Sequence, residues 1–306
     1  MSTSAPIESL AATTKDLGGG FTVRRLLPAL RRQAVGPFVF FDHFGPLVVQ
    51  PADSHDVRPH PHIGLATLTY LFDGAMQHHD STGAFQRIEP GAVNWMCAGR
   101  GVVHSERRPA DLRQHAYALH GLQLWVAAPE SHEDIEPSFQ HVGVDRIPPA
   151  STPGGGARLR VLAGQAHGLR SPLVTMSPTL FVDYELAPGA GVELPGRDEA
   201  AERAVYPVQG RPQLHAADGE VIELPLHQLA VLPDDDALRL RAGTEPARVV
   251  LVGGTPLGRR HLWWNFVASR PERIERAAQA WQDDTLGQVP GETERIPLPA
   301  ARFRAT

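Results

Sequence analysis

Hydrophobic and polar residues alternate along this chain over short runs that are separated by turn residues. Residues 66–72 form such a run, and turn residues follow at 73–74, 81–83 and 90–91. A period of two is typical of β-strands that bury one face. The same rhythm returns in the second half of the chain, at residues 157–163, 179–186, 204–209, 221–224, 229–232 and 247–253. The pattern therefore predicts an all-β protein.

One stretch near the C-terminus has a helical pattern instead. Ile274, Ala277, Ala278 and Trp281 are spaced so that they fall on one face of a helix. A capping-box pattern begins at Ser269, with its glutamate three residues later. We expect a helix here that packs its apolar stripe on the β core, beside a few other short helices.

Segments rich in proline, glycine and acidic residues interrupt the strand rhythm near the middle of the chain. The length of 306 residues is sufficient for two domains. The Ser, Thr, Ala and Gly content of the first residues suggests a loose arm. We predict a flexible N-terminal arm at 1–20, a first β domain at 21–135, a linker at 136–156 and a second β domain at 157–306.

Composition narrows the classes of protein that the chain can belong to. The 42% hydrophobic and 21% charged residues are typical of a soluble globular protein. No apolar run approaches the roughly 20 residues of a membrane-spanning helix, and the net charge of −5 argues against direct nucleic-acid binding. Cys97 is the only cysteine and the first residues lack the pattern of a secretory signal, so we expect a cytoplasmic protein.

Two pairs of polar residues carry the candidate chemistry. His60 and His62 form one pair, and His104 and Glu106 form the other. Alternate residues of a strand share a face, so each pair presents two ligands to the same side. If the two strands lie side by side, three imidazoles and one carboxylate converge, a set that suits one divalent transition metal with open positions. A single histidine is more often a surface residue, but two such pairs favour a metal site.

Further residues are candidates for a substrate pocket beside this metal. They are Phe40, Phe41, His43, His78, Trp95 and Gln123. Packing in the core is the alternative for the aromatic residues, a hydrogen-bonded core position for His43, and a solvent-exposed turn for His78. The second half of the chain contains no comparable pair of ligands, so we expect its domain to bind no metal.

The stretch around these ligands resembles the pirin family of bicupins. The resemblance rests on the segments GPFVFFDHFGP, HPHIGLATLTYLFDG, MQHHDSTG, GAVNWMCAGRGVVHSE and HGLQLWV. It implies two tandem cupin domains, which are jelly-roll β-barrels, with metal in the N-terminal domain alone. The implied ligands are His60, His62, His104 and Glu106. Fe(II) is the metal that the resemblance implies, and the ligand set also accepts Mn, Ni, Cu or Co.

The resemblance implies two different functions. One is a quercetin 2,3-dioxygenase, which cleaves quercetin or a related flavonol or aromatic enol with dioxygen. Glu106 would then be the catalytic base that takes a proton from the substrate hydroxyl. The alternative is a non-enzymatic, iron-dependent redox sensor that binds a protein partner. We favour the dioxygenase, although the sequence contains no feature that identifies the natural substrate.

Overall fold

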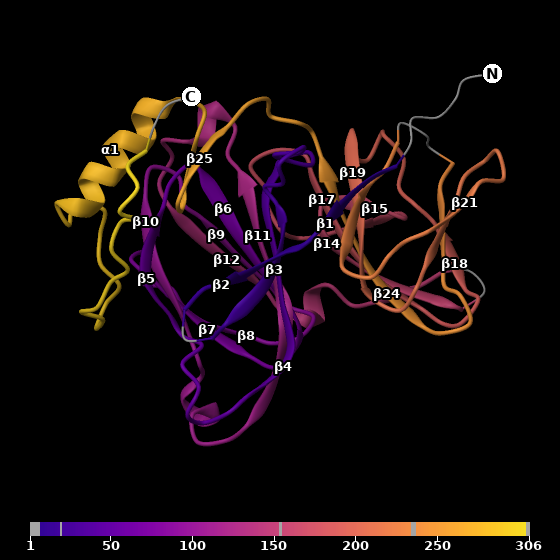
Figure 1. The fold of residues 1–306 in the computed structure, drawn as a ribbon, viewed down its shortest axis with the longest axis horizontal. Helices are drawn as coiled ribbons and strands as arrows, with labels where there is room; N and C mark the ends of the chain where they lie inside the picture. The colour runs from indigo at the N-terminus through magenta and orange to yellow at the C-terminus, as the bar shows by residue number, and fades with distance from the viewer. Residues whose placement is uncertain (1–6, 19, 153–154, 234–236, 304–306) are drawn as a thin grey trace. The chain divides into compact units, whose positions relative to one another are not determined.

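The computed structural model describes residues 7–18, 20–152, 155–233 and 237–303, and antiparallel β-sheets dominate it (Figure 1). The all-β prediction is confirmed. The described residues contain three 3-10 turns, η1 (Ala110–Leu112), η2 (Glu130–His132) and η3 (Val144–Arg146), and one α-helix, α1 (Pro271–Gln282). None of the helices in these ranges has the length and apolar character needed to cross a membrane.

Two sheets surround the histidine pairs. The strands of the larger sheet are β2 (Thr13–Asp16), β3 (Thr22–Leu27), β4 (Phe38–Val49), β6 (Leu65–Asp73), β9 (Val93–Cys97), β11 (Tyr117–Ala127) and β12 (Ser138–Val142), in the order β12-β9-β6-β11-β4-β3-β2. The smaller sheet consists of β5 (Val57–His62), β7 (Met76–Asp80), β8 (Phe85–Ile88) and β10 (Val102–Arg107), in the order β5-β10-β7-β8. Buried residues of both sheets, among them Phe44, Leu71, Met76 and Ile88, form one core cluster between them.

A second pair of sheets repeats this arrangement. The larger sheet contains β1 (Glu8–Ala11), β13 (Ala150–Ser151), β14 (Ala157–Ala163), β17 (Thr179–Leu186), β19 (Glu202–Gln209), β22 (Gln228–Val231) and β24 (Ala247–Gly254), in the order β1-β22-β19-β24-β17-β14-β13. The smaller sheet contains β18 (Gly191–Glu193), β20 (Gln213–His215), β21 (Val221–Glu223) and β23 (Arg239–Arg241). Two short hairpins complete the strands, β15 (Gln165–Ala166) with β16 (Leu169–Arg170) and β25 (His261–Trp263) with β26 (Phe266–Ala268).

The chain divides into two compact units, and neither unit is one continuous segment. The histidine unit, as we call it, comprises Phe40–Val144, Thr14–Val23 and the chain from Leu257 onward. The second unit comprises Asp145–Pro256, Arg24–Val39 and the chain up to Thr13. The predicted boundaries differ from this division, because they assign residues 24–39 to the first domain and all residues from 157 onward to the second.

Two of the predicted segments also need correction. Part of the predicted arm is a strand, since Glu8–Ala11 pairs antiparallel with β22. The predicted linker contains β12, which pairs with β9, and β13, which pairs with β14. Composition misled in both cases, because pairing with a neighbouring strand can order a segment that has few apolar residues. Residues 1–6, 19 and 153–154 of these predicted segments lie outside the described residues.

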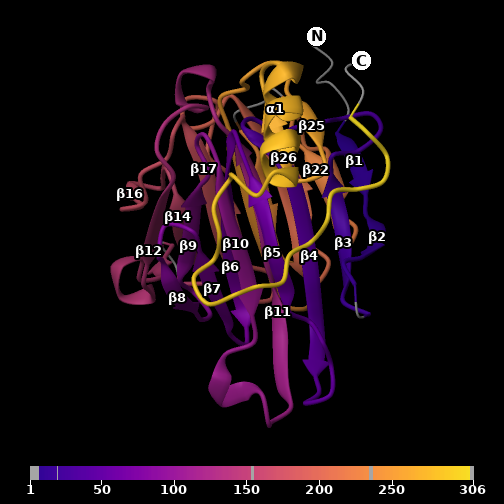
Figure 2. The same cartoon turned by 90° about the vertical axis from the view of Figure 1, so that its left-hand side faces the viewer.

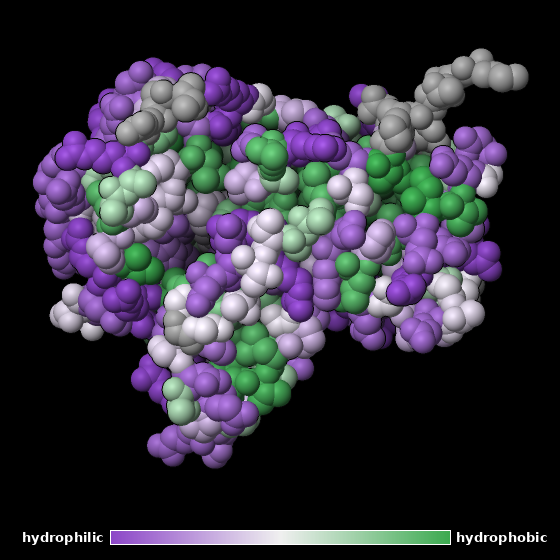
Figure 3. Space-filling model, viewed as in Figure 1, coloured by the Kyte–Doolittle hydropathy of each residue, from purple (hydrophilic) through white to green (hydrophobic). Residues whose placement is uncertain are grey.

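Helix α1 confirms the predicted apolar stripe but begins differently. Ile274, Ala277 and Trp281 are buried in one cluster. Its other members include Ile63 next to β5, Val103 of β10 and Phe266 of β26. The N-cap residue is Arg270, and its side chain makes no capping bond. Ser269 instead donates its backbone N–H and its hydroxyl to the buried carboxylate of Glu133, at 2.6 and 3.0 Å. The capping-box prediction was therefore wrong, although the helix exists, and the surface over it is mainly hydrophilic (Figure 3).

The chain after β24 belongs to the histidine unit. Strand β26 lies against Ile63, and α1 packs on β25 and β26. Gly64 has a positive φ, and a Cβ atom there would lie 2.1 Å from the carbonyl oxygen of Val267. A glycine is needed at this position because the backbone of β26 approaches so closely. From α1 the chain continues across the outer face of β5 and β10 (Figure 2).

We expect the substitution Trp281→Ala to reduce the free energy of unfolding by about 3–5 kcal/mol, because it leaves a cavity under α1. The exposed helix position Glu275 is the matched control, and Glu275→Ala should change stability by less than about 0.5 kcal/mol. Urea unfolding followed by tryptophan fluorescence and circular dichroism measures both. Equal stabilities of the two variants would contradict the packing described for α1.

Candidate metal centre

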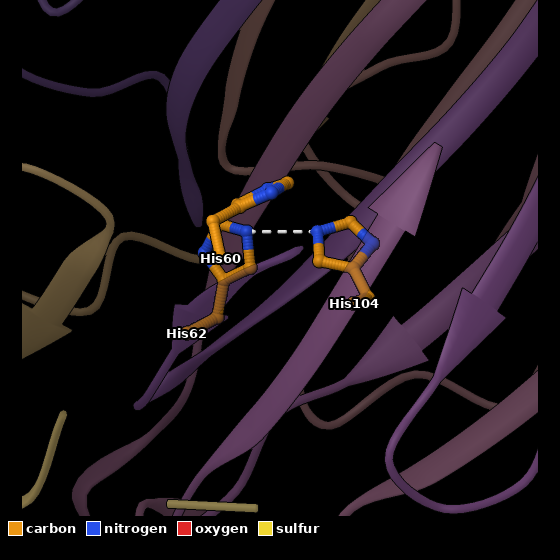
Figure 4. A group of neighbouring side chains, drawn as sticks. All are labelled: His60, His62 and His104. Atoms are coloured by element: carbon orange, nitrogen blue, oxygen red, sulfur yellow. Dashed lines mark hydrogen bonds between the residues drawn. The ribbon is translucent and has the colours of Figure 1, made fainter. Parts of the chain in front are cut away.

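The pairing of β5 with β10 brings the two histidine pairs together. In the register of this antiparallel pair, His104 lies opposite His60 and Val102 lies opposite His62. The two-residue period of β5 places the side chains of His60 and His62 on the same face. His104 meets them from β10, and Figure 4 shows the three rings converging. The predicted convergence of three imidazoles is therefore observed.

The three imidazoles form a compact and buried group. One nitrogen of each histidine lies within 4.8 Å of the corresponding atoms of the others. Nε2 of His62 and Nε2 of His104 are 3.0 Å apart, as the dashed line in Figure 4 indicates. No second group of three or more such side chains occurs among the residues that the structure describes.

Hydrogen bonds to backbone carbonyls orient two of the rings. Nδ1 of His60 lies 2.8 Å from the carbonyl oxygen of Arg58, and Nδ1 of His62 lies 2.9 Å from that of Asn265. A carbonyl oxygen only accepts, so Nδ1 carries the proton and Nε2 keeps its lone pair. Metal-binding histidines typically have this arrangement, in which an outer partner fixes the tautomer and the ring orientation. The donor set therefore fits a transition-metal ion.

Burial keeps the three imidazoles uncharged. It lowers the pKa of His60 to about 4 and moves the pKa values of His62 and His104 well below their usual range, with a further contribution from repulsion between the rings. Desolvation disfavours the protonated form of each ring. At neutral pH all three are available as neutral nitrogen ligands.

Glu106 lies beside the histidines but is not part of the compact group. Its Oε1 is 3.8 Å from Nδ1 of His104, which is the ring nitrogen without any hydrogen-bond partner. Burial raises the pKa of Glu106 to about 7. Gln123 donates from Nε2 to Oε1 of Glu106 at 3.2 Å and accepts from the Thr69 hydroxyl at 2.8 Å. A cation near this carboxylate would favour its ionised form.

An aromatic pair borders the histidines. The ring of Phe40 stacks on Trp125 with a centroid distance of 3.9 Å, and Trp125 meets the ring of His62 edge-on at 5.0 Å. Gln123 and Trp125 are two residues apart in β11 and share this face. Gln123 was predicted as a pocket residue and Trp125 was not, although its i, i+2 spacing from Gln123 on a strand indicates the same face.

Three of the predicted pocket residues lie on the opposite face of the larger sheet. Phe41 and His43 alternate with Phe40 in β4, so their side chains point away from Trp125. His43 contacts His120 instead, with 2.7 Å between the Nε2 atoms. Trp95 pairs with Leu68, whereas its neighbour Met96 pairs with Thr67 on the face of Trp125. These three side chains therefore do not line the space beside the histidine group.

His78 is buried, and the solvent-exposed turn considered for it does not occur. It lies on β7 opposite Glu106, and its ring centroid is 5.3 Å from that of His104. Nε2 of His78 bonds to the fully buried Asp80 carboxylate at 2.9 Å, and its ring stacks on Phe139. Asp80 was not selected from the sequence, although its i, i+2 spacing from His78 on a strand could have revealed it.

Comparisons with known proteins agree with this architecture. The family model described as Pirin matches residues 20–126, and the model described as Pirin C-terminal cupin domain matches residues 181–287. A Pirin-like protein of Caulobacter vibrioides is 44% identical over 94% of this chain and 97% of that protein. Human Pirin is 32% identical, over 88% of this chain and 89% of its own length.

A solved structure is similar over nearly the full length. The crystal structure described as quercetin 2,3-dioxygenase from Acinetobacter baumannii has a TM-score of 0.87 and 30% identity, over 98% of this chain and 97% of that one. Together with the two family models, these relatives show that the chain belongs to the pirin family. The prediction of two cupin domains is thereby confirmed.

We expect the purified protein to bind about one transition-metal ion per chain and the His62→Ala variant to lose most of it, because one of three convergent nitrogen ligands is removed. His115→Ala is the matched control, since His115 is exposed and lies in the bend before β11, outside the group of three histidines. Elemental analysis after dialysis measures the metal. Equal metal content in the His62→Ala variant and the wild type would contradict the assignment.

Proposed function

We propose that this protein is a metal-dependent dioxygenase that cleaves a flavonol such as quercetin, or a related aromatic enol. The observation that carries the proposal is the group of three neutral, buried imidazoles next to a carboxyl group whose pKa is raised to about 7. The similarity to a structure described as a quercetin 2,3-dioxygenase supports it. The substrate and the reaction are inferred for this chain by analogy with that protein.

His60, His62 and His104 would hold the ion through their Nε2 atoms, with Glu106 as a fourth ligand. Bound there, Fe(II), or Mn, Ni, Cu or Co, would act as a Lewis acid on the substrate oxygens and supply the chemistry that dioxygen requires. Glu106 lies beside the compact group rather than inside it, since its Oε1 is 3.8 Å from Nδ1 of His104.

Glu106 is also the proposed base. Burial alone raises the pKa of Glu106 to about 7, and a cation bound beside it would lower that pKa, so the ionised carboxylate would be available to take a proton from an enol or phenol hydroxyl. Gln123 holds Oε1 of this carboxylate, and Thr69 holds Gln123, so the acceptor is kept in one orientation. The loss of the proton would increase the electron density of the substrate ring.

Phe40 and Trp125 provide a flat apolar surface next to His62. We assign to them the placement of a planar aromatic substrate, because aromatic rings prefer offset-stacked or edge-to-face contacts of this kind. Their burial in the interior would also limit the access of water to the reacting atoms.

Oxygen uptake tests the proposal. The apoprotein is loaded separately with Fe(II), Mn, Ni, Cu and Co, and oxygen consumption is recorded with quercetin. We expect uptake with at least one metal. The Glu106→Gln variant should then show a kcat lower by about 10²–10⁴, the contribution typical of a general base, while Glu89→Gln at an exposed position should match the wild type.

Metal binding without oxygen uptake for any of the five metals would contradict the dioxygenase. It would favour the alternative function, a redox sensor that binds a protein partner. A normal kcat in the Glu106→Gln variant would remove Glu106 from the catalytic role and leave the metal site in place.

A further inference from the structure

The chain after α1 crosses the outer face of the metal-binding strands β5 and β10, as both ribbon views show (Figures 1 and 2). We call residues 283–303 the C-terminal strap. The strap is tied to α1, because Trp281 Nε1 donates to the carbonyl oxygen of Ile296 at 3.1 Å. The guanidinium group of Arg295 also lies 4.0 Å above the Trp281 ring and bonds to Asp284. The strap is therefore held in a defined position.

Glu292 of the strap contacts two side chains of β10. Its carboxylate accepts a hydrogen bond from the Ser105 hydroxyl at 2.6 Å and from Arg107 Nε at 3.1 Å. His79 Nδ1 of β7 lies 3.5 Å from the same carboxylate. Ser105 and Arg107 alternate with His104 and Glu106, so Glu292 binds the outer face of β10 directly behind the candidate ligands.

The strand pairing is irregular at this position. His104 pairs with His60 but Glu106 pairs with Val57, so Ser105 faces two residues of β5, Arg58 and Pro59. Such a bulge changes the direction of the adjacent side chains and leaves the ladder locally weak. The carbonyl oxygen of Arg58, within the bulge, is also the one that orients His60. The bulge therefore affects ligands on both strands.

The strap contacts the bulge on both of its strands. On β10, Glu292 bonds to Ser105, and on β5 the backbone N–H of Ile296 donates to the carbonyl oxygen of Pro59 at 2.8 Å. An exposed ion pair contributes little to stability. The side chain of Glu292 is only 16% exposed, however, and its carboxylate contacts residues of two strands, β10 and β7. The strap therefore contacts the bulge through one side-chain hydrogen bond on β10 and one backbone hydrogen bond on β5.

We propose that Glu292 is a positioning residue for the metal centre, and that the strap holds the β5–β10 bulge in the shape that directs His60, His104 and Glu106 toward one ion. This inference rests on the metal centre of the proposed function and does not depend on the identity of the substrate. It assigns a role to Glu292 and Ile296, which follow the matched C-terminal cupin domain that ends at residue 287.

The proposal is tested by titrating the apoprotein with Co(II) alone and recording the visible absorption spectrum. The ligand-field bands of Co(II) report coordination number and geometry, which a purely stabilising contact would not change. For Glu292→Ala we expect about tenfold weaker binding of Co(II), the lower end of the loss typical for residues outside the ligand shell, together with altered bands. Melting temperatures of the apoproteins report any general loss of stability.

Glu294→Ala is the matched control. Glu294 lies on the same strap and bonds to the same Arg107, but its side chain is 50% exposed and contacts no group of the bulge in the hydrogen bonds described. We expect wild-type affinity and bands for this variant. If it weakened Co(II) binding as much as Glu292→Ala, the specific role of Glu292 would be overturned.

Ser105→Ala removes only the hydroxyl that binds Glu292 and serves if Glu292→Ala does not fold. It should weaken Co(II) binding in the same direction, and the double variant should bind no more weakly than Glu292→Ala, because both residues act through one contact. Unchanged affinity and bands in both single variants would overturn the inference.

A wild type that binds no Co(II) would overturn the metal centre as well. Co(II) binding without oxygen uptake by any metal-loaded form would contradict only the dioxygenase.

Discussion

The antiparallel pairing of β5 with β10 is the constraint on which the rest of the site depends. It places His104 opposite His60, and the two-residue period of β5 adds His62 on the same face. A shift of this register by one residue would turn the ligands of one strand to the other face of the sheet. The backbone carbonyl oxygens of Arg58 and Asn265 then complete the orientation of the rings. Everything proposed about metal and substrate follows from this arrangement.

The cupin interior determines the charge of the groups that it contains. Burial keeps the three imidazoles neutral and raises the pKa of Glu106 to about 7. A site with three neutral nitrogen ligands and a carboxyl group that a nearby cation would ionise suits a divalent cation better than an anion. The aromatic pair of Phe40 and Trp125 gives the same space an apolar wall. Metal and planar substrate would therefore meet at one place.

The sequence predicted the features that depend on local spacing. The i, i+2 pairs gave three converging histidines, and the apolar spacing gave α1 with its buried Trp281. The sequence did not predict which of the two faces of β4 points to the site, because this depends on the contact of Phe40 with Trp125 of β11. It also did not predict contacts over long separations, such as the carbonyl oxygen of Asn265 on His62, 203 residues away. A backbone acceptor has no sequence signature.

The central claim is that one ion binds to the three histidines, and X-ray diffraction from crystals of the metal-loaded protein tests it most directly. Data collected at the absorption edge of the added metal locate the ion by its anomalous scattering. We predict a single strong peak about 2.0–2.1 Å from nitrogen atoms of His60, His62 and His104, the distance typical of histidine ligands of zinc. A peak elsewhere in the protein, or no peak between β5 and β10 in metal-loaded crystals, would contradict it.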